Sequence, residues 1–181
     1  MLAGVDADLT IQVKEQARLQ GADLVGVASM DRFEGAPKQY DPRYIFPDAK
    51  AMVVLGFRIP RGTLRGIEEG TYFIGYSSMG YSAINHVRQP MVLWGLTNFL
   101  EDRGWEAVPI HNEWRWSHGT RGYGTPTSRP VSPDKPAPDV KIQMRLAAVA
   151  AGLGEIGWSH LLLTPEFGPR QRLACLITDA P

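Results

Sequence analysis

The chain has 181 residues, 44% of them hydrophobic and 21% charged, which is typical of a globular domain with one core. Its 19 basic and 19 acidic residues balance, so charge gives no footprint for nucleic acid or an anionic membrane, although tRNA is not excluded. The single cysteine excludes an intrachain disulfide and a cysteine-ligated iron–sulfur cluster held by this chain alone.

The sequence predicts neither a membrane span nor a secretion signal. No apolar run approaches the roughly 20 residues that cross a bilayer. The first residues, MLAGVDADLT, lack a basic segment followed by an apolar one. We therefore expect a cytoplasmic protein without membrane contacts. Cys175 lies inside an apolar stretch, which predicts a buried thiol.

The first elements follow from hydrophobic periodicity. Residues 9–21 have the period of a helix, and the apolar residues 24–28 predict a strand. Residues 31–48 are rich in proline, glycine and aromatic residues, so we expect mainly loop. The unbroken, partly β-branched run 51–57 is typical of a strand that is buried on both faces.

A longer helix and an edge strand are predicted next. Residues 81–103 carry an apolar stripe that includes Leu93, Leu96 and Leu100, and Pro90 should kink or break this helix. Residues 105–110 predict a strand whose Pro109 favours a place at the sheet edge. Residues 111–139 have no regular period, and connections of this length inside compact domains are usually functional.

The C-terminal part predicts a helix over residues 141–151, with Ile142, Leu146 and Val149 or Ala150 on its apolar face. A glycine turn over residues 152–157 follows. Residues 161–163 and 173–178 predict two strands, which we expect to be joined in a hairpin-like manner by residues 164–169.

The glycine turn spells G-x-G-x-x-G at Gly152, Gly154 and Gly157, with Asp179 about 20 residues later, as in a dinucleotide-binding fingerprint. That fingerprint needs glycines that follow a strand and open a helix. Here the predicted helix precedes the glycines, and Pro165 soon follows them. We therefore favour a helix end with a tight turn over a dinucleotide site.

Three stretches together resemble the corrinoid-binding region of epoxyqueuosine reductases and reductive dehalogenases. They are residues 150–157 (AAGLGEIG), 161–170 (LLLTPEFGPR) and 176–181 (LITDAP). The resemblance implies an α/β (α+β) fold, a mixed β-sheet flanked by helices, as in nitroreductase-like and cobalamin-trafficking proteins. It also implies that residues 1–181 form a single domain that binds cobalamin.

The resemblance also implies a source of electrons outside this chain. In both families, two cysteine-rich cluster motifs follow the ITD-P element, whereas this sequence stops at Pro181. We expect either a fragment of a longer protein with a C-terminal ferredoxin-like region or a naturally short relative. Iron–sulfur clusters are expected only if such a region exists, and otherwise a ferredoxin-like protein would be the electron donor.

The resemblance points to seven cofactor-binding residues around the glycine turn. They are Gly152, Leu153, Gly154, Gly157, Ser159, His160 and Leu161. Ser159 and the backbone N–H groups of the turn would hold the phosphate of the nucleotide tail. His160 would hydrogen-bond a corrin amide or a phosphate, or ligate cobalt. The alternative is that the glycines serve only the turn and the histidine is structural.

Two residues are candidates for the proton donor. Epoxyqueuosine reductases carry an aspartate in an Asp-x-Ala-Pro-Val stretch, and residues 136–140 (PAPDV) make Asp139 the nearest match. Dehalogenases use a tyrosine, and Tyr123 is available in the long connection. Asp139 has a structural alternative as a solvated carboxylate or helix cap. The family's Gly-Lys-Asn element is Gly157-Trp158-Ser159 here, so its lysine is missing.

The function implied is that of the cobalamin-binding domain of a reductive oxidoreductase acting on a small organic substrate. A non-catalytic corrinoid carrier or chaperone is one alternative, and it would need no acid residue. A flavin-dependent reductase is the other, because related folds bind flavin. No metal-ligand spacing is found in the sequence, so no protein-ligated metal site is predicted.

Overall fold

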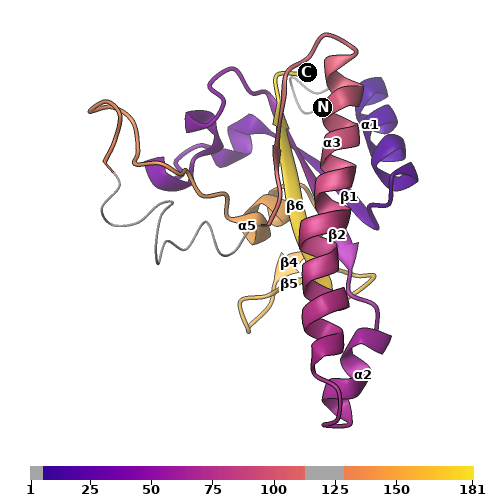
Figure 1. Ribbon diagram of the computed structural model, residues 1–181. Helices are drawn as coiled ribbons and strands as arrows, with labels where there is room; N and C mark the ends of the chain where they lie inside the picture. The colour runs from indigo at the N-terminus through magenta and orange to yellow at the C-terminus, as the bar shows by residue number, and fades with distance from the viewer. Residues whose placement is uncertain (1–5, 113–128) are drawn as a thin grey trace.

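The computed structural model describes residues 6–112 and 129–181 (Figure 1). Its centre is a four-stranded sheet in the order β1-β2-β6-β3, formed by Leu24–Ser29, Ala51–Arg58, Gln171–Thr178 and Ala107–Ile110. The pairings β1–β2, β2–β6 and β6–β3 are all antiparallel. The expected mixed sheet is therefore wrong for the described residues, because the chain reverses direction between each pair of neighbouring strands.

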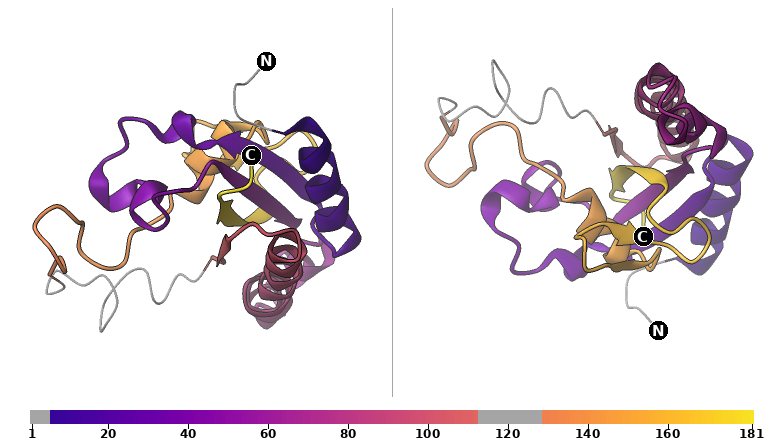
Figure 2. Two further views of the ribbon diagram at one scale, coloured as in Figure 1. Left: turned by 90° about the horizontal axis from the view of Figure 1, so that it is seen from above. Right: turned by 90° about the horizontal axis from the view of Figure 1, so that it is seen from below.

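Helices cover both faces of the sheet, which confirms the predicted α/β (α+β) class. Figure 2 shows α1 (Ala7–Leu19) and α3 (Gln89–Glu101) on one face. The other face is covered by α5 (Met144–Ala150), and the chain around residues 30–50 lies on the same side. The short α2 (Gly62–Glu68) lies beyond one end of the sheet, next to the start of the long helix (Figure 1).

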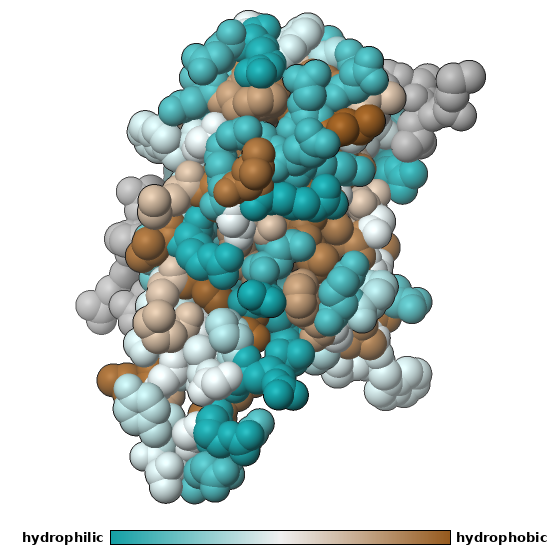
Figure 3. All heavy atoms as spheres, turned by 90° about the vertical axis from the view of Figure 1, so that its right-hand side faces the viewer, coloured by the Kyte–Doolittle hydropathy of each residue, from teal (hydrophilic) through white to brown (hydrophobic). Residues whose placement is uncertain are grey.

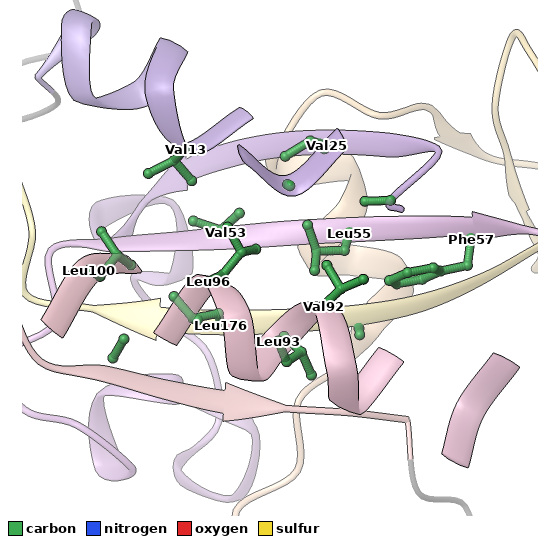
Figure 4. Close-up of a cluster of buried hydrophobic side chains, with 14 of the residues drawn as sticks. Val13, Val25, Val53, Leu55, Phe57, Val92, Leu93, Leu96, Leu100 and Leu176 are labelled. Atoms are coloured by element: carbon green, nitrogen blue, oxygen red, sulfur yellow. The ribbon is translucent and has the colours of Figure 1, made fainter. Parts of the chain in front are cut away.

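The two central strands divide the core into two clusters. Alternate side chains of β2 point to opposite faces, so Val53, Leu55 and Phe57 pack under α1 and α3, whereas Met52 and Val54 pack toward α5. Figure 4 shows the first cluster, which is formed by side chains of β1, β2 and β6 together with side chains of α1 and α3. Residues 51–57 are all buried, which confirms the prediction of a strand covered on both faces.

The N-terminal helix is defined by its cap. The Asp6 carboxylate accepts hydrogen bonds from the backbone N–H groups of Asp8 and Leu9, at 2.9 and 3.0 Å. Val13 and Ala17 are buried against the sheet, as the periodicity predicts. Hydrophilic residues cover much of the side of the molecule that α1 faces, with separate hydrophobic spots among them (Figure 3).

The long helix begins earlier than predicted. The turns Tyr76–Ser82 and Ile84–Arg88 are wound more widely, as π-helix, and run into α3. Pro90 lies in the first turn of α3, where the winding tightens. A proline has no N–H to donate to the preceding turn, and so it marks this change instead of ending the helix. Leu93, Leu96 and Leu100 are buried, as predicted.

The remaining strands correct one prediction and confirm another. β3 lies at the sheet edge, which confirms the reading of Pro109. β5 (Leu162–Leu163) does not form a hairpin with β6; it pairs with β4 (Glu155–Ile156) in a separate two-stranded sheet. β6 has apolar side chains toward both faces, and it pairs with β2 at eight positions and with β3 at four, more than the two-residue β5 could offer.

The segment predicted as mainly loop, residues 31–48, contains short 3-10 turns. They are Met30–Phe33, which begins one residue before it, Lys38–Tyr40 and Pro42–Tyr44. The Asp41 carboxylate fixes the last of them, because it accepts from the Arg43 backbone N–H at 3.0 Å and from the Arg43 guanidinium at 2.9 Å. Among the residues that the structure describes, no helix is long and apolar enough to cross a bilayer.

Candidate corrinoid-binding surface

The glycine turn is the C-terminal cap of α5. Gly152 has a φ of 74°, which favours glycine, and its N–H donates to the Val149 carbonyl at 3.0 Å. The next N–H, of Leu153, donates to the Ala148 carbonyl at 2.9 Å. These two bonds form a Schellman motif. The glycines therefore follow a helix and do not open one, which rules out the dinucleotide fingerprint.

Gly154 allows the chain after the cap to lie directly against β5. A Cβ at this position would lie 2.9 Å from the Leu163 carbonyl carbon and 3.2 Å from the Thr164 Cα, and it would overlap the Leu163 carbonyl oxygen. Only glycine permits this approach, which brings β4 into pairing distance of β5. Residues 152–163 therefore form a compact hairpin attached to the end of α5, referred to below as the β4–β5 hairpin.

The tip of the hairpin is closed by two backbone hydrogen bonds of 2.9 Å. The Gly157 N–H donates to the Leu161 carbonyl, and the His160 N–H donates to the Gly157 carbonyl. His160 has a φ of 59°. The Arg145 guanidinium donates to the His160 carbonyl, so α5 and the hairpin tip are tied together.

The structure brings the seven predicted cofactor residues together in this cap and hairpin. Ser159, His160 and Leu161 are exposed at the tip, whereas Leu153 packs against the core cluster under α5. The N–H groups of Gly152, Leu153 and Gly157 already donate within the protein. A phosphate-binding role of the turn amides therefore stays a prediction. The exposed polar side chains beside them are those of Ser159 and His160.

The orientation of α5 corrects the predicted apolar face. Ala147 and Ala148 are the fully buried residues of this helix, while Leu146 is 59% exposed and Val149 is 37% exposed. Small residues face inward because the helix end lies very close to β1. A Cβ on Gly26 would lie 2.9 Å from the Ala151 Cβ. The larger apolar side chains are therefore turned outward.

An exposed apolar surface results, formed by α5 and the hairpin. Its members are large hydrophobic side chains that are exposed in the described structure: Leu146, Val149, Ile156, Trp158, Leu161 and Leu163. We call this the α5–hairpin surface. Trp158 is fully exposed. A group of exposed apolar residues of this size is typical of a binding surface. The sequence patterns did not identify Leu146, Val149 and Trp158 as candidate binding residues. The alanine pair in α5 was the signal that could have revealed the first two.

Asp139 lies on the other side of α5 from the glycine turn. It precedes the helix and is exposed, and its backbone carbonyl accepts from the Gln39 side-chain amide at 2.7 Å. A seven-residue helix spans about 10 Å. The candidate donor and the candidate cofactor residues are thus attached to opposite ends of this helix. Tyr123 lies outside the described residues.

Neither a reactive cysteine nor a metal site held by protein side chains finds support in the described ranges. Cys175 is fully buried, and burial raises the pKa of its thiol to about 12, so it stays protonated at neutral pH. Residues 6–112 and 129–181 contain no group of three or more His, Cys, Asp or Glu side chains placed to hold a metal ion.

Comparisons with known proteins identify the fold. No protein-family model and no curated protein matches the chain. Solved structures do match. The reductive dehalogenase NpRdhA, solved with 3-bromo-4-hydroxybenzoic acid, has a TM-score of 0.61 at 19% identity over 93% of this chain and 20% of its own. A reductive dehalogenase whose structure was interpreted in terms of B12-dependent dehalogenation has a TM-score of 0.62, at 19% identity and the same coverage.

An epoxyqueuosine reductase in complex with an epoxyqueuosine-modified tRNA stem loop is also similar. Its TM-score is 0.56 at 17% identity, over 96% of this chain and 46% of its own. The chain therefore spans between a fifth and a half of the length of these proteins. The resemblance seen in the sequence is confirmed at the level of the fold, which is that of a module within reductive dehalogenases and epoxyqueuosine reductases.

Proposed function

We propose that this chain is a single corrinoid-binding domain, residues 1–181, of a cytoplasmic reductive oxidoreductase, and that cobalamin binds on the α5–hairpin surface. The observation that carries the proposal is the orientation of α5, which buries Ala147 and Ala148 and turns Leu146 and Val149 outward. Exposing the larger apolar residues of a helix to water while its alanines are buried is unfavourable unless a ligand or partner covers them.

The residues present fit a corrinoid. Its macrocycle is broad and apolar on its faces and carries amide groups at its rim. The α5–hairpin surface offers exposed apolar side chains, and the hairpin tip adds the Ser159 hydroxyl and the His160 imidazole, both exposed. These two side chains would hydrogen-bond rim amides or the phosphate of the nucleotide tail. When bound, the corrinoid supplies the redox chemistry, and the protein supplies binding, orientation and a proton.

Asp139 is the proposed proton donor among the described residues. Its peptide segment is held by Gln39, whose side-chain amide donates to the carbonyls of Ala137 and Asp139 at 2.9 and 2.7 Å. Electrons must come from elsewhere, because the single cysteine cannot hold an iron–sulfur cluster. We propose a ferredoxin-like domain or protein as the donor.

An anaerobic visible-absorption titration of the purified chain with cobalamin tests the binding. We expect a saturable spectral change, weakened on the order of tenfold by Leu161→Ser, which removes an apolar side chain from the surface. Leu19→Ser is the matched control, because Leu19 is also an exposed leucine but lies on α1, on the other face of the sheet. Equal affinity of the two variants would contradict the proposed surface.

The same titration with FMN addresses the alternative of a flavin-dependent reductase. Saturable FMN binding without cobalamin binding would replace the corrinoid proposal with that alternative. The carrier alternative is tested with Asp139→Asn in bromide release from para-bromophenol, with cobalamin and a chemical reductant present. General acid catalysis predicts a loss of about 10²-fold or more. If Asp139→Asn and the wild type release bromide equally, Asp139 is not the donor.

A further inference from the structure

A concave site lies beside the α5–hairpin surface. It is a cleft of about 330 Å³ between the 3-10 turns of residues 30–46 and residues 142–146, which lead into and begin α5. Its lining residues are Phe33, Ala36, Pro37, Tyr40, Pro42, Ile142, Gln143 and Leu146. This volume is at the lower end of the range for small-molecule sites, which is roughly 300–1,000 Å³. Leu146 belongs to both sites, so the cleft and the α5–hairpin surface adjoin.

Hydrogen bonds hold the two walls of the cleft in place. The Gln39 carbonyl accepts from the Lys141 N–H at 2.9 Å, while the Gln39 side chain donates to Ala137 and Asp139. The Arg32 guanidinium donates to the Ala150 carbonyl at 3.0 Å, at the end of α5. The first wall is therefore connected to the second at both ends of the helix, and the cleft is largely preformed.

The chemistry of the lining defines the ligand. None of the described residues that line the cleft carries a charge. Asp41, between two lining residues, is paired with Arg43, and the guanidinium holds the pKa of the Asp41 carboxyl below its ordinary value. Phe33 and Tyr40 supply aromatic surface, and the Tyr40 hydroxyl and the Gln143 amide supply a few polar atoms. Burying a charged ligand here without an opposite charge would be costly.

We propose that this cleft is the substrate site, and that it takes a small, uncharged organic molecule with an aromatic or other unsaturated ring. Its role as a substrate site rests on the proposed function, whereas the binding itself does not. The position of the cleft supports the role. The Gln39 bonds hold the Asp139 peptide segment next to Tyr40, and the adjoining α5–hairpin surface would carry the cofactor.

Fluorine NMR of the full chain with para-fluorophenol, uncharged at pH 7, tests the cleft directly. We expect saturable broadening of the fluorine signal and a much weaker effect with para-fluorobenzoate, which is charged. Ala36→Trp fills the cleft and should weaken binding tenfold or more. Ala7→Trp, at an exposed position on α1, is the matched control and should leave binding unchanged.

Tyr40→Leu removes the aromatic wall without adding bulk, and it keeps the test decisive if Ala36→Trp fails to fold. We expect it also to weaken phenol binding. No saturable binding to the wild type, or equal binding by the wild type and both cleft variants, would overturn the site. Tighter binding of the benzoate would overturn the uncharged class of ligand.

A cobalamin titration of the same samples separates this inference from the proposed function. Ala36→Trp should lose phenol binding and keep cobalamin binding. Phenol binding in a chain that binds no cobalamin would leave the cleft as a ligand site and remove its role as a substrate site. Cobalamin binding without phenol binding would contradict the proposed ligand site in the cleft and leave the corrinoid proposal standing.

Discussion

Gly154→Ala is the most informative single substitution, because it targets the contact that brings β4 to β5. The new methyl group would lie 2.9 Å from the Leu163 carbonyl carbon, where an ordinary contact is 3.4–4 Å. The neighbour is backbone and cannot rotate away, so the two strands must separate by on the order of 1 Å. Overpacking of this kind costs about 1–3 kcal/mol of unfolding free energy.

Gly62→Ala is the control for this substitution. Gly62 opens α2, and a Cβ there would meet no atom within 4 Å. Thermal unfolding should show a fall of several degrees for Gly154→Ala, since about 1 kcal/mol corresponds to ~2–4 °C in a chain of this size. Gly62→Ala should unfold at the wild-type temperature or slightly above it, because alanine favours a helix.

Cobalamin titration of the same two variants then connects the hairpin to function. If the hairpin carries the cofactor residues, Gly154→Ala should weaken cobalamin binding on the order of tenfold, ~1.4 kcal/mol, while Gly62→Ala should not. A Gly154→Ala chain with wild-type stability would refute the packing argument. Normal cobalamin binding by a destabilised Gly154→Ala chain would refute the role of the hairpin.

Three further substitutions or treatments follow from the structure. Leu146→Ser should change the unfolding free energy by no more than about 0.5 kcal/mol, because the side chain is mostly exposed, yet weaken both cobalamin and phenol binding; a large loss in urea-denaturation stability would show that Leu146 is a core residue. Cys175 should resist iodoacetamide at pH 8 in the native chain and react after unfolding. Burial raises the pKa of its thiol from 9.0 to about 12, so its contribution to the unfolding free energy should be fully present below pH 9 and fall as pH rises from there toward 12. A Cys175→Ala chain with the same alkaline loss of stability would contradict this. Asp41→Asn should lower the unfolding free energy by about 1–2 kcal/mol at pH 7 and weaken phenol binding. Since Arg43 lowers the pKa of Asp41, the difference in stability from the wild type should persist to below pH 3.8 in acid denaturation and disappear only as the carboxylate is protonated. A stability difference that does not depend on pH would point to packing instead.

Much of the sheet could be predicted because local pattern decides it. The run at residues 51–57 is apolar on both sides of the strand, and only a central position buries both. Pro109 cannot donate to a ladder, and so its strand is confined to the edge. Gly152 could be read as a helix end because it follows an alanine-rich period and supplies the positive φ that the cap needs.

The rest depends on contacts between distant residues. The pairing of β5 with β4 is set by the close approach of Gly154 to Leu163, which no short window of sequence reveals. The outward face of α5 depends on how near the helix lies to Gly26 on β1. Periodicity alone placed Leu146 inside, since it counts hydrophobicity and not the space available. The cleft beside Tyr40 is likewise invisible in sequence, because its two walls are about 100 residues apart.

The alanine pair under α5 has a thermodynamic consequence for any ligand that binds above it. Alanine has no side-chain rotamers, so Ala147 and Ala148 lose no rotamer entropy when the chain folds and cannot rearrange when a ligand arrives. The support beneath Leu146 and Val149 is therefore fixed before binding, and this layer adds nothing to the ordering cost that usually reduces affinity. For the same reason, the inward positions should accept only glycine, alanine or serine over evolutionary time, whereas the outward positions are free to follow the shape of the ligand.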